Sequence, residues 1–177
     1  EQIVAKMSKS LKNVVNPDDE IKAYGADSVR MYEMFMGPLT MSKPWATQGI
    51  VGIHRFLEKV WAASEKNMDD TDIFGKLDDE KLISARKTFV QTIKKVTNDT
   101  ASLNFNTAIS QMMIFMNEIS KLDSIPRAMW SDFVKALSPY APHLGEELWQ
   151  KLGNKTSIAY EPWPTVNDEF ALDDEKT

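Results

Sequence analysis

Apolar residues recur every three or four positions through most of the chain, and alternating strand patterns are almost absent. This spacing predicts amphipathic helices. The first long helix, for example, carries Ile50, Ile53, Leu57 and Val60 on one face. The long helices are expected over residues 47–65, 78–103, 107–122, 126–138 and 143–152. Because short joints connect them, we predict an all-α, antiparallel helical bundle.

Capping residues mark shorter elements ahead of the bundle. Residues 1–16 have no helical period and predict an irregular segment. Asn16 is expected to cap a short helix that opens with Pro17 and ends at Gly25. Asp27 should cap a second helix, from residue 28 to 36, and Thr47 should cap the first long helix.

Composition narrows the class of protein. The chain has 177 residues, of which 42% are hydrophobic and 27% charged, as in ordinary globular domains. With no cysteine, disulfides and thiolate chemistry are excluded, and no apolar run approaches the roughly 18–20 residues of a membrane span. The net charge of −5 means that any RNA contact must use a local basic stripe. The chain starts at Glu1 without a methionine, so we expect a piece of a longer protein.

One short segment carries candidate chemistry. Lys6-Met7-Ser8-Lys9-Ser10 places two lysines three positions apart among small hydroxyl residues, in a stretch with no apolar period. Ammonium groups suit phosphate oxygens, and such a loop could close over a triphosphate. On spacing alone, a solvated terminus with two ordinary lysines is the favoured interpretation.

Several motifs in order carry a family resemblance over essentially the whole chain. KMSKS is the signature loop of class I aminoacyl-tRNA synthetases, and the segments that follow it resemble the leucine, isoleucine and valine enzymes. The later segments resemble leucyl-tRNA synthetases of the bacterial type in particular. The matching segments are NVVNP at 13–17, YGADSVR at 24–30, FMGPL at 35–39, SKPW at 42–45, HRFL at 54–57, PYAPHL at 139–144, EELW at 146–149 and WP at 163–164.

The resemblance implies an activity. By this resemblance, the intact enzyme would be a leucine–tRNA ligase that activates leucine with ATP and Mg²⁺ and transfers it to tRNA(Leu). Lys9 would be the chief contact to the ATP phosphates and Lys6 a second one, both with catalytic roles. Met7, Ser8 and Ser10 would complete the ATP-binding loop. The HIGH motif, the nucleotide-binding sheet and the editing domain are not in this sequence, so the piece alone is expected to be inactive, with no cofactor bound.

The resemblance also implies an organisation. Residues 1–45 would be the end of the catalytic domain, with the KMSKS loop and short helices that contact the tRNA stem. Residues 46–153 would form the anticodon-binding helical bundle, and residues 154–177 a linker towards a C-terminal domain. The intact enzyme is expected to be a cytoplasmic monomer.

A basic stripe is the candidate RNA surface. Arg55, Lys59 and Lys66 fall on one side of the first long helix, opposite its apolar face. Alone, the stripe predicts a solvated face. The resemblance favours phosphate contacts to tRNA, which would position the RNA backbone. No spacing of His54 or His143 indicates a metal site or acid–base chemistry, and both are expected to be structural.

Two alternatives stay open. The amino acid could be isoleucine or valine, although the segments at 35–39 and 42–45 favour leucine. A stand-alone helical protein-interaction module, using its methionine- and tryptophan-rich faces, would leave the KMSKS match an accident.

Overall fold

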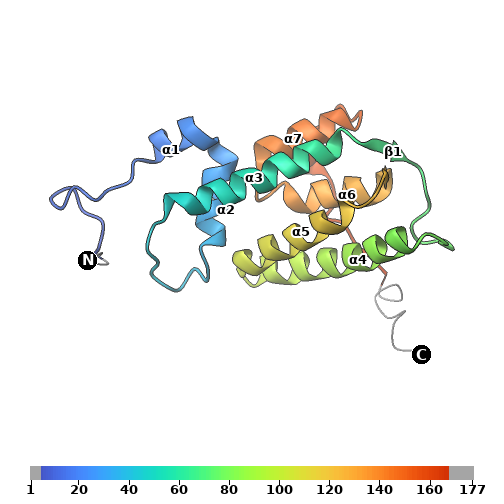
Figure 1. Cartoon of the computed structure of the whole chain (residues 1–177), viewed down its shortest axis with the longest axis horizontal. Coiled ribbons are helices and arrows are strands. Elements are labelled where there is room, and N and C mark those ends of the chain that lie inside the picture. The colour runs from blue at the N-terminus through green and yellow to red at the C-terminus, as the bar shows by residue number, and fades with distance from the viewer. Residues whose placement is uncertain (1–4, 168–177) are drawn as a thin grey trace.

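The computed structural model describes residues 5–167, and the acidic C-terminal residues 168–177 lie outside that range. Seven α-helices and one 3-10 helix account for most of the described chain, together with two three-residue strands. The prediction of an all-α bundle is confirmed (Figure 1). The helices are α1 (Pro17–Tyr24), α2 (Ala26–Phe35), α3 (Thr47–Ser64), α4 (Glu80–Ala101), α5 (Phe105–Ile119), α6 (Arg127–Leu137), α7 (Pro142–Lys151) and η1 (Ile158–Tyr160).

Aromatic side chains form the centre of the bundle. Phe89 of α4 packs on Phe115 of α5, and Phe115 packs on Phe133 of α6, with ring centroids 5.8 and 4.9 Å apart. Trp130 completes the row at 5.5 Å from Phe133, and these four rings are buried. Each large ring removes much apolar surface from water, so this row is a main source of stability.

The helix starts show where local capping rules hold and where they fail. Asn16 caps α1 as predicted, because its side chain accepts a hydrogen bond from the backbone N–H of Asp18. The predicted caps Asp27 and Thr47 are wrong. Gly25 precedes α2 with a φ of 84°, so that Asp27 lies inside the helix, and Ala46 is the residue before α3.

Two short strands were not predicted. β1 (Asn67–Asp69) and β2 (Ser124–Pro126) pair in parallel, although they are more than fifty residues apart in the sequence. The Ser124 hydroxyl donates to the Asp69 carboxylate over 2.6 Å. Three residues are too few to display an alternating pattern, which explains why the sequence does not reveal them.

Helix α2 joins the N-terminal segment to the bundle. Its Tyr32 hydroxyl bonds both the carbonyl and the N–H of Ala46, at 2.8 and 3.1 Å. Gly49 of α3 lets this tyrosine approach, since a Cβ at that position would lie 2.3 Å from the Tyr32 ring. The contact fixes the angle between α2 and the first long helix.

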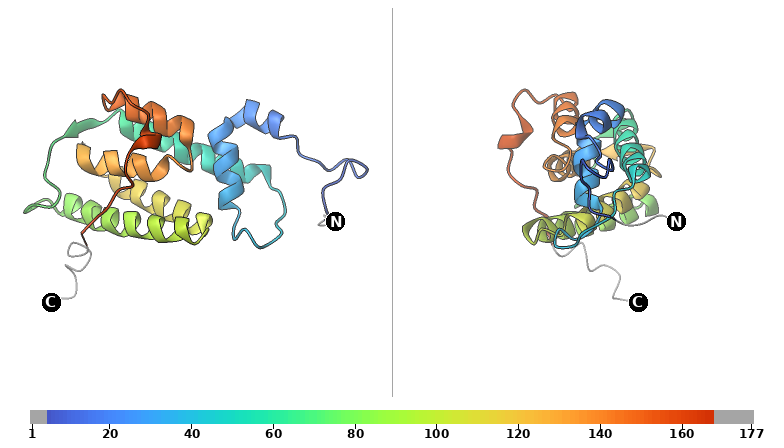
Figure 2. Two further views of the ribbon diagram at one scale, coloured as in Figure 1. Left: turned by 180° about the vertical axis from the view of Figure 1, so that it is seen from behind. Right: turned by 90° about the vertical axis from the view of Figure 1, so that its left-hand side faces the viewer.

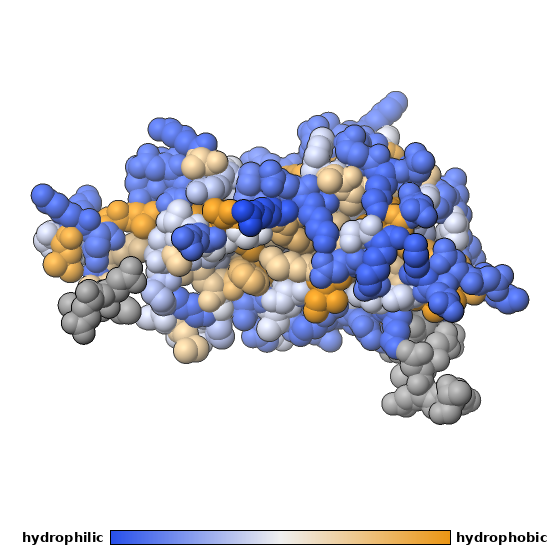
Figure 3. Space-filling model, in the orientation of Figure 1, coloured by the Kyte–Doolittle hydropathy of each residue, from blue (hydrophilic) through white to orange (hydrophobic). Residues whose placement is uncertain are grey.

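The irregular segment before α1 extends away from the helices, as Figure 1 and the left view of Figure 2 show. In the space-filling view, hydrophobic atoms lie among hydrophilic ones at this end (Figure 3). Met7, Leu11 and Val14 are among the exposed large hydrophobic residues. Residues 5–16 therefore gain little from hydrophobic burial.

Candidate functional site

The KMSKS segment is a loop closed by hydrogen bonds between its own polar groups. The side-chain amide of Asn13 accepts from the N–H of Ser8 at 2.8 Å and donates to the carbonyl of Lys6 at 3.3 Å. The Ser8 hydroxyl accepts from the N–H of Leu11 at 3.3 Å and lies 3.1 Å from the Ser10 hydroxyl. The loop thus has a defined shape without a core beneath it.

Lys6 and Lys9 are both exposed on this loop. Within residues 5–167, neither ammonium group takes part in an ion pair or side-chain hydrogen bond. The N–H of Lys12 donates to the carbonyl of Lys9 at 3.2 Å, which closes a turn around the second lysine. Two cations held on a short polar loop and open to solvent can receive the oxygens of a triphosphate.

The three residues of the basic stripe differ in their exposure and in their hydrogen bonds. Arg55 is exposed, and within the described part of the chain it makes no hydrogen bond or ion pair. Lys59 is half-buried, and its ammonium donates to the Asn117 side chain of α5 at 2.7 Å. Of the stripe, Arg55 is the side chain most available to an external anion.

The ammonium of Lys66 is already hydrogen-bonded within the fold. It donates to the carbonyls of Ile119, Ser120 and Leu122, at 3.4, 3.0 and 2.6 Å. These carbonyls lie at and just after the end of α5, where a helix leaves its last acceptors without intrahelical partners, and the Ile119 carbonyl also accepts from the N–H of Leu122 at 3.2 Å. An ammonium has three donors, so this arrangement uses all of them. An RNA contact by Lys66 stays a prediction, and it would require the side chain to leave these partners.

The two histidines connect neighbouring helices. His54 Nδ1 lies 3.1 Å from the Ser28 hydroxyl, joining α3 to α2. His143 Nδ1 lies 2.8 Å from the Asp27 carboxylate, which also accepts from the backbone N–H groups of His143 and Leu144 at 3.3 and 2.7 Å. Asp27 therefore caps α7, which lies 116 residues further along the chain, instead of its own helix.

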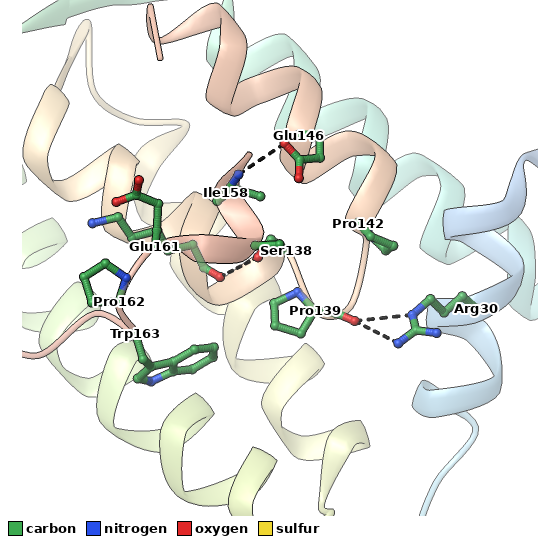
Figure 4. Close-up of a pocket in the computed structure, with 11 residues that line it drawn as sticks. Arg30, Ser138, Pro139, Pro142, Glu146, Ile158, Glu161, Pro162 and Trp163 are labelled. Carbon is green, nitrogen blue, oxygen red and sulfur yellow. Dashed lines mark hydrogen bonds between the residues drawn. The ribbon is translucent and has the colours of Figure 1, made fainter. Parts of the chain in front are cut away.

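A second contact holds the same junction. The Arg30 guanidinium of α2 donates from Nε and Nη2 to the carbonyl of Pro139, at 3.3 and 3.0 Å (Figure 4). It borders a hollow of about 520 Å³ between α2, α6, α7 and the segment around η1. Glu146, on the same hollow, accepts from the Ser157 hydroxyl and from the N–H of Ile158. These polar groups hold the C-terminal segment and α2 to the bundle.

Neither a metal site nor a membrane span emerges from residues 5–167. In that range no three His, Cys, Asp or Glu side chains gather as a metal ion would require. None of the helices described is long and apolar enough to cross a membrane.

The sequence analysis did not identify Asn13 as a residue that shapes the loop, or Asp27 and Arg30 as the residues that join α2 to the region of α7. A signal existed for Asn13: an asparagine beside a polar, aperiodic stretch often bonds nearby backbone groups. No local signal existed for the other two, because their partners are more than one hundred residues away.

Comparisons with known proteins define the class. Residues 84–177 match the model of the anticodon-binding domain of tRNA ligase, and residues 4–42 match that of class I tRNA synthetases (I, L, M and V). The chain belongs to the family of the anticodon-binding domain of tRNA ligases.

The relatives identify which ligase the chain resembles. It is 54% identical to the leucine–tRNA ligase of Treponema pallidum subsp. pallidum, over 94% of the chain and 21% of the relative. It is 51% identical to that of Borreliella burgdorferi, over 99% of the chain and 20% of the relative. The chain is thus homologous to leucine–tRNA ligases and spans about a fifth of their length.

A solved structure of a leucyl-tRNA synthetase complex is similar to this chain. The crystal structure of the ternary complex of Agrobacterium radiobacter K84 agnB2 LeuRS, tRNA and LeuAMS superposes with a TM-score of 0.80. The identity is 29%, covering 94% of this chain and 23% of that one. The isoleucyl and valyl alternatives and the stand-alone interaction module are not favoured by these comparisons.

Proposed function

We propose that this chain is the KMSKS-bearing and tRNA-docking part of a leucine–tRNA ligase. The observation that supports it most is the joining of two features: an exposed pair of lysines on a shaped loop, and a helical bundle of the anticodon-binding family. We keep the division into the end of the catalytic domain at 1–45, the bundle at 46–153 and the linker at 154–177. The intact enzyme is proposed to be a cytoplasmic monomer.

The proposed chemistry is the activation of leucine. A carboxylate oxygen of leucine forms a bond to the α-phosphorus of ATP, and the bond from that phosphorus to the bridging oxygen breaks, so that pyrophosphate leaves. Negative charge builds on the leaving phosphates, and Lys9, assisted by Lys6, stabilises it. Met7, Ser8 and Ser10 shape the loop around these phosphates. Bound Mg²⁺ would neutralise further phosphate charge, and we assign none of this chain's residues to it.

The chain alone should not perform this reaction. Its sequence contains no HIGH motif and no candidate nucleotide-binding sheet. Two lysines cannot orient leucine and ATP by themselves, and most of the rate enhancement depends on such orientation. Purified residues 1–177 should therefore show no leucine-dependent exchange of pyrophosphate into ATP.

The test of the ATP role is Lys9→Ala in the full-length ligase. We expect leucine-dependent pyrophosphate exchange to fall roughly 100-fold or more, as when one charge-stabilising donor is removed. Lys22→Ala removes an equal charge from the exposed face of α1, outside the loop, and should leave exchange unchanged. Unaltered exchange in Lys9→Ala would overturn the assignment.

The proposed partner of the bundle is tRNA(Leu). Arg55 and Lys59 are the preferred phosphate contacts, and Lys66 would join them only by releasing its carbonyl partners. Because phosphate contacts release counterions, Arg55→Ala should weaken tRNA binding and lower the slope of log affinity against log salt by about one. Lys76→Ala, at a lysine that is 89% exposed in the loop before α4, is the matched control. An unchanged slope in Arg55→Ala would contradict the contact.

A further inference from the structure

The side chain of Asn13 bonds two backbone groups of the KMSKS loop. Its Oδ1 accepts from the N–H of Ser8 at 2.8 Å, and its Nδ2 donates to the carbonyl of Lys6 at 3.3 Å. These two backbone groups lie on either side of Met7. A single amide therefore fixes the segment that connects the two lysines of the loop.

Few other interactions could replace this brace. Lys6, Met7, Lys9, Ser10 and the following residues through Val14 are exposed, so hydrophobic burial contributes little to the shape of the loop. The remaining contacts are the Ser8 hydroxyl with Leu11 and Ser10, and the turn from Lys9 to Lys12. Asn13 is the one residue in this set whose side chain bonds the backbone on both sides of Met7.

The brace matters because the position of each lysine ammonium depends on the conformation of the backbone that carries it. Catalytic groups act well only when they are held close to the geometry of the transition state. Without the amide, residues 6–8 could sample many conformations, and the ammonium groups would less often face the phosphates. Neither bond of Asn13 requires contact with ATP, so the residue would act through its neighbours.

We propose that Asn13 is a positioning residue of the ATP-phosphate loop, which holds Lys6 and Lys9 in the arrangement that stabilises the leaving pyrophosphate. This inference rests on the proposed function of the loop. It assigns to Asn13 a role in leucine activation and none in tRNA docking.

The chemistry of the amide allows a graded test. Asn13→Ala removes both bonds. Asn13→Asp keeps an acceptor for the N–H of Ser8 but loses the donor to Lys6, and it also places a negative charge beside the phosphate loop. Asn13→Gln keeps both functions on a longer stem, so any recovery relative to alanine reports the amide itself. Activity should fall in the order wild type, Gln, Ala, Asp.

The experiment measures leucine-dependent pyrophosphate exchange in the full-length ligase, with a double-mutant cycle between Asn13→Ala and Lys9→Ala. We expect Asn13→Ala to lower the exchange rate at saturating ATP by roughly 10- to 100-fold, as expected for a misplacement of about 1 Å. If Asn13 acts by placing the lysines, the double variant should be little worse than Lys9→Ala alone. Transfer of leucine from preformed adenylate to tRNA should stay within about twofold of wild type, because that step does not use the leaving pyrophosphate.

Asn16→Ala is the matched control. It removes an asparagine three residues away that caps α1, and it should lower stability without lowering exchange.

The outcomes separate the two claims. Wild-type exchange in Lys9→Ala would overturn the proposed function itself. A strong loss in Lys9→Ala with wild-type exchange in Asn13→Ala would overturn only the positioning role. Fully multiplicative losses in the double variant would show that Asn13 acts independently of Lys9. An equal loss in Asn16→Ala would show that the effect comes from general disruption of the segment before α1, and either result would overturn the positioning role.

Discussion

The loop at residues 6–13 and the bundle of α4, α5 and α6 are built by opposite means. The loop is held by hydrogen bonds among exposed polar groups, whereas the bundle packs Phe89, Phe115, Phe133 and Trp130 out of contact with water. Local stability follows buried apolar contacts, so the loop belongs to the low-stability end of the molecule. The proposed closure of the loop over ATP would gain from this property, while the proposed docking of RNA on the bundle would gain from rigidity.

Helix α2 connects the two regions. Asp27 and Arg30 attach it to the start of α7 and to the turn before it, and Tyr32 attaches it to the start of α3. These contacts fix α2 on the bundle, and α1 and residues 14–16 connect α2 to the loop. Helix α2 thus connects the segment with the candidate phosphate-binding loop to the well-packed bundle.

The largest expected effect on stability lies in the bundle. Phe133→Ala should lower the free energy of unfolding by about 3–5 kcal/mol, because it leaves a cavity in the aromatic row. Met7→Ala, in the loop, should change it by less than about 0.5 kcal/mol. Urea unfolding of the purified chain, followed by circular dichroism, measures both. Similar losses in the two variants would erase the contrast between the regions.

The next effect concerns Lys66. Lys66→Met keeps the aliphatic stem but removes the ammonium donor from the carbonyls of Ser120 and Leu122, and from that of Ile119, which keeps the N–H of Leu122; this should cost about 1–3 kcal/mol. Lys59→Met breaks a single bond, to Asn117, and should cost less. The same urea titration compares them. A stability loss in Lys59→Met equal to that in Lys66→Met would argue that Lys66 does not stabilise the end of α5 through these carbonyls.

The junction should show an intermediate effect. Asp27→Ala removes the acceptor for two backbone N–H groups of α7 and should cost about 0.5–2 kcal/mol, as for other helix caps. Hydrogen exchange of the chain should then rise at the first turn of α7 while the amides of α5 stay protected. Uniform loss of protection in both helices would instead indicate global destabilisation.

The smallest effect is a pH dependence at the paired strands. Hydrogen bonds from Ser124 and then Thr71 hold the pKa of Asp69 below its ordinary value of 3.8, against a smaller opposing effect of burial. A carboxyl group with a lowered pKa in the folded state contributes stability above the unfolded value. That contribution is lost as the pH falls through the folded pKa. Ser124→Ala should therefore lower stability at about pH 7 more than at about pH 3, measured by urea unfolding. If the stability difference between the wild type and Ser124→Ala grew towards low pH, the assigned effect of Ser124 on the pKa of Asp69 would be contradicted.

The sequence predicts the buried face of each helix better than the polar contacts between helices. Periodic residues such as Ile50 and Ile53 lie in the core because burial follows directly from helical spacing. Partners of Asp27, Lys66 and Arg30 depend on which helix ends meet in space, and that is decided by the whole packing. The KMSKS segment is visible in the sequence, whereas Asn13 gives only the general signal of an asparagine beside a polar, aperiodic stretch. Lys6, Lys9, Arg55 and Lys59 are assigned through the family resemblance, because the phosphates that they are proposed to contact are not part of the chain.

The most direct test is a single-turnover measurement of leucyl-adenylate formation by the full-length ligase carrying Lys9→Ala. The account predicts a rate lower by roughly 100-fold or more, with an unfolding midpoint in urea equal to that of the wild type. Adenylate formation close to the wild-type rate, in an enzyme equally stable, would contradict the claim that this loop supplies chemistry to the reaction.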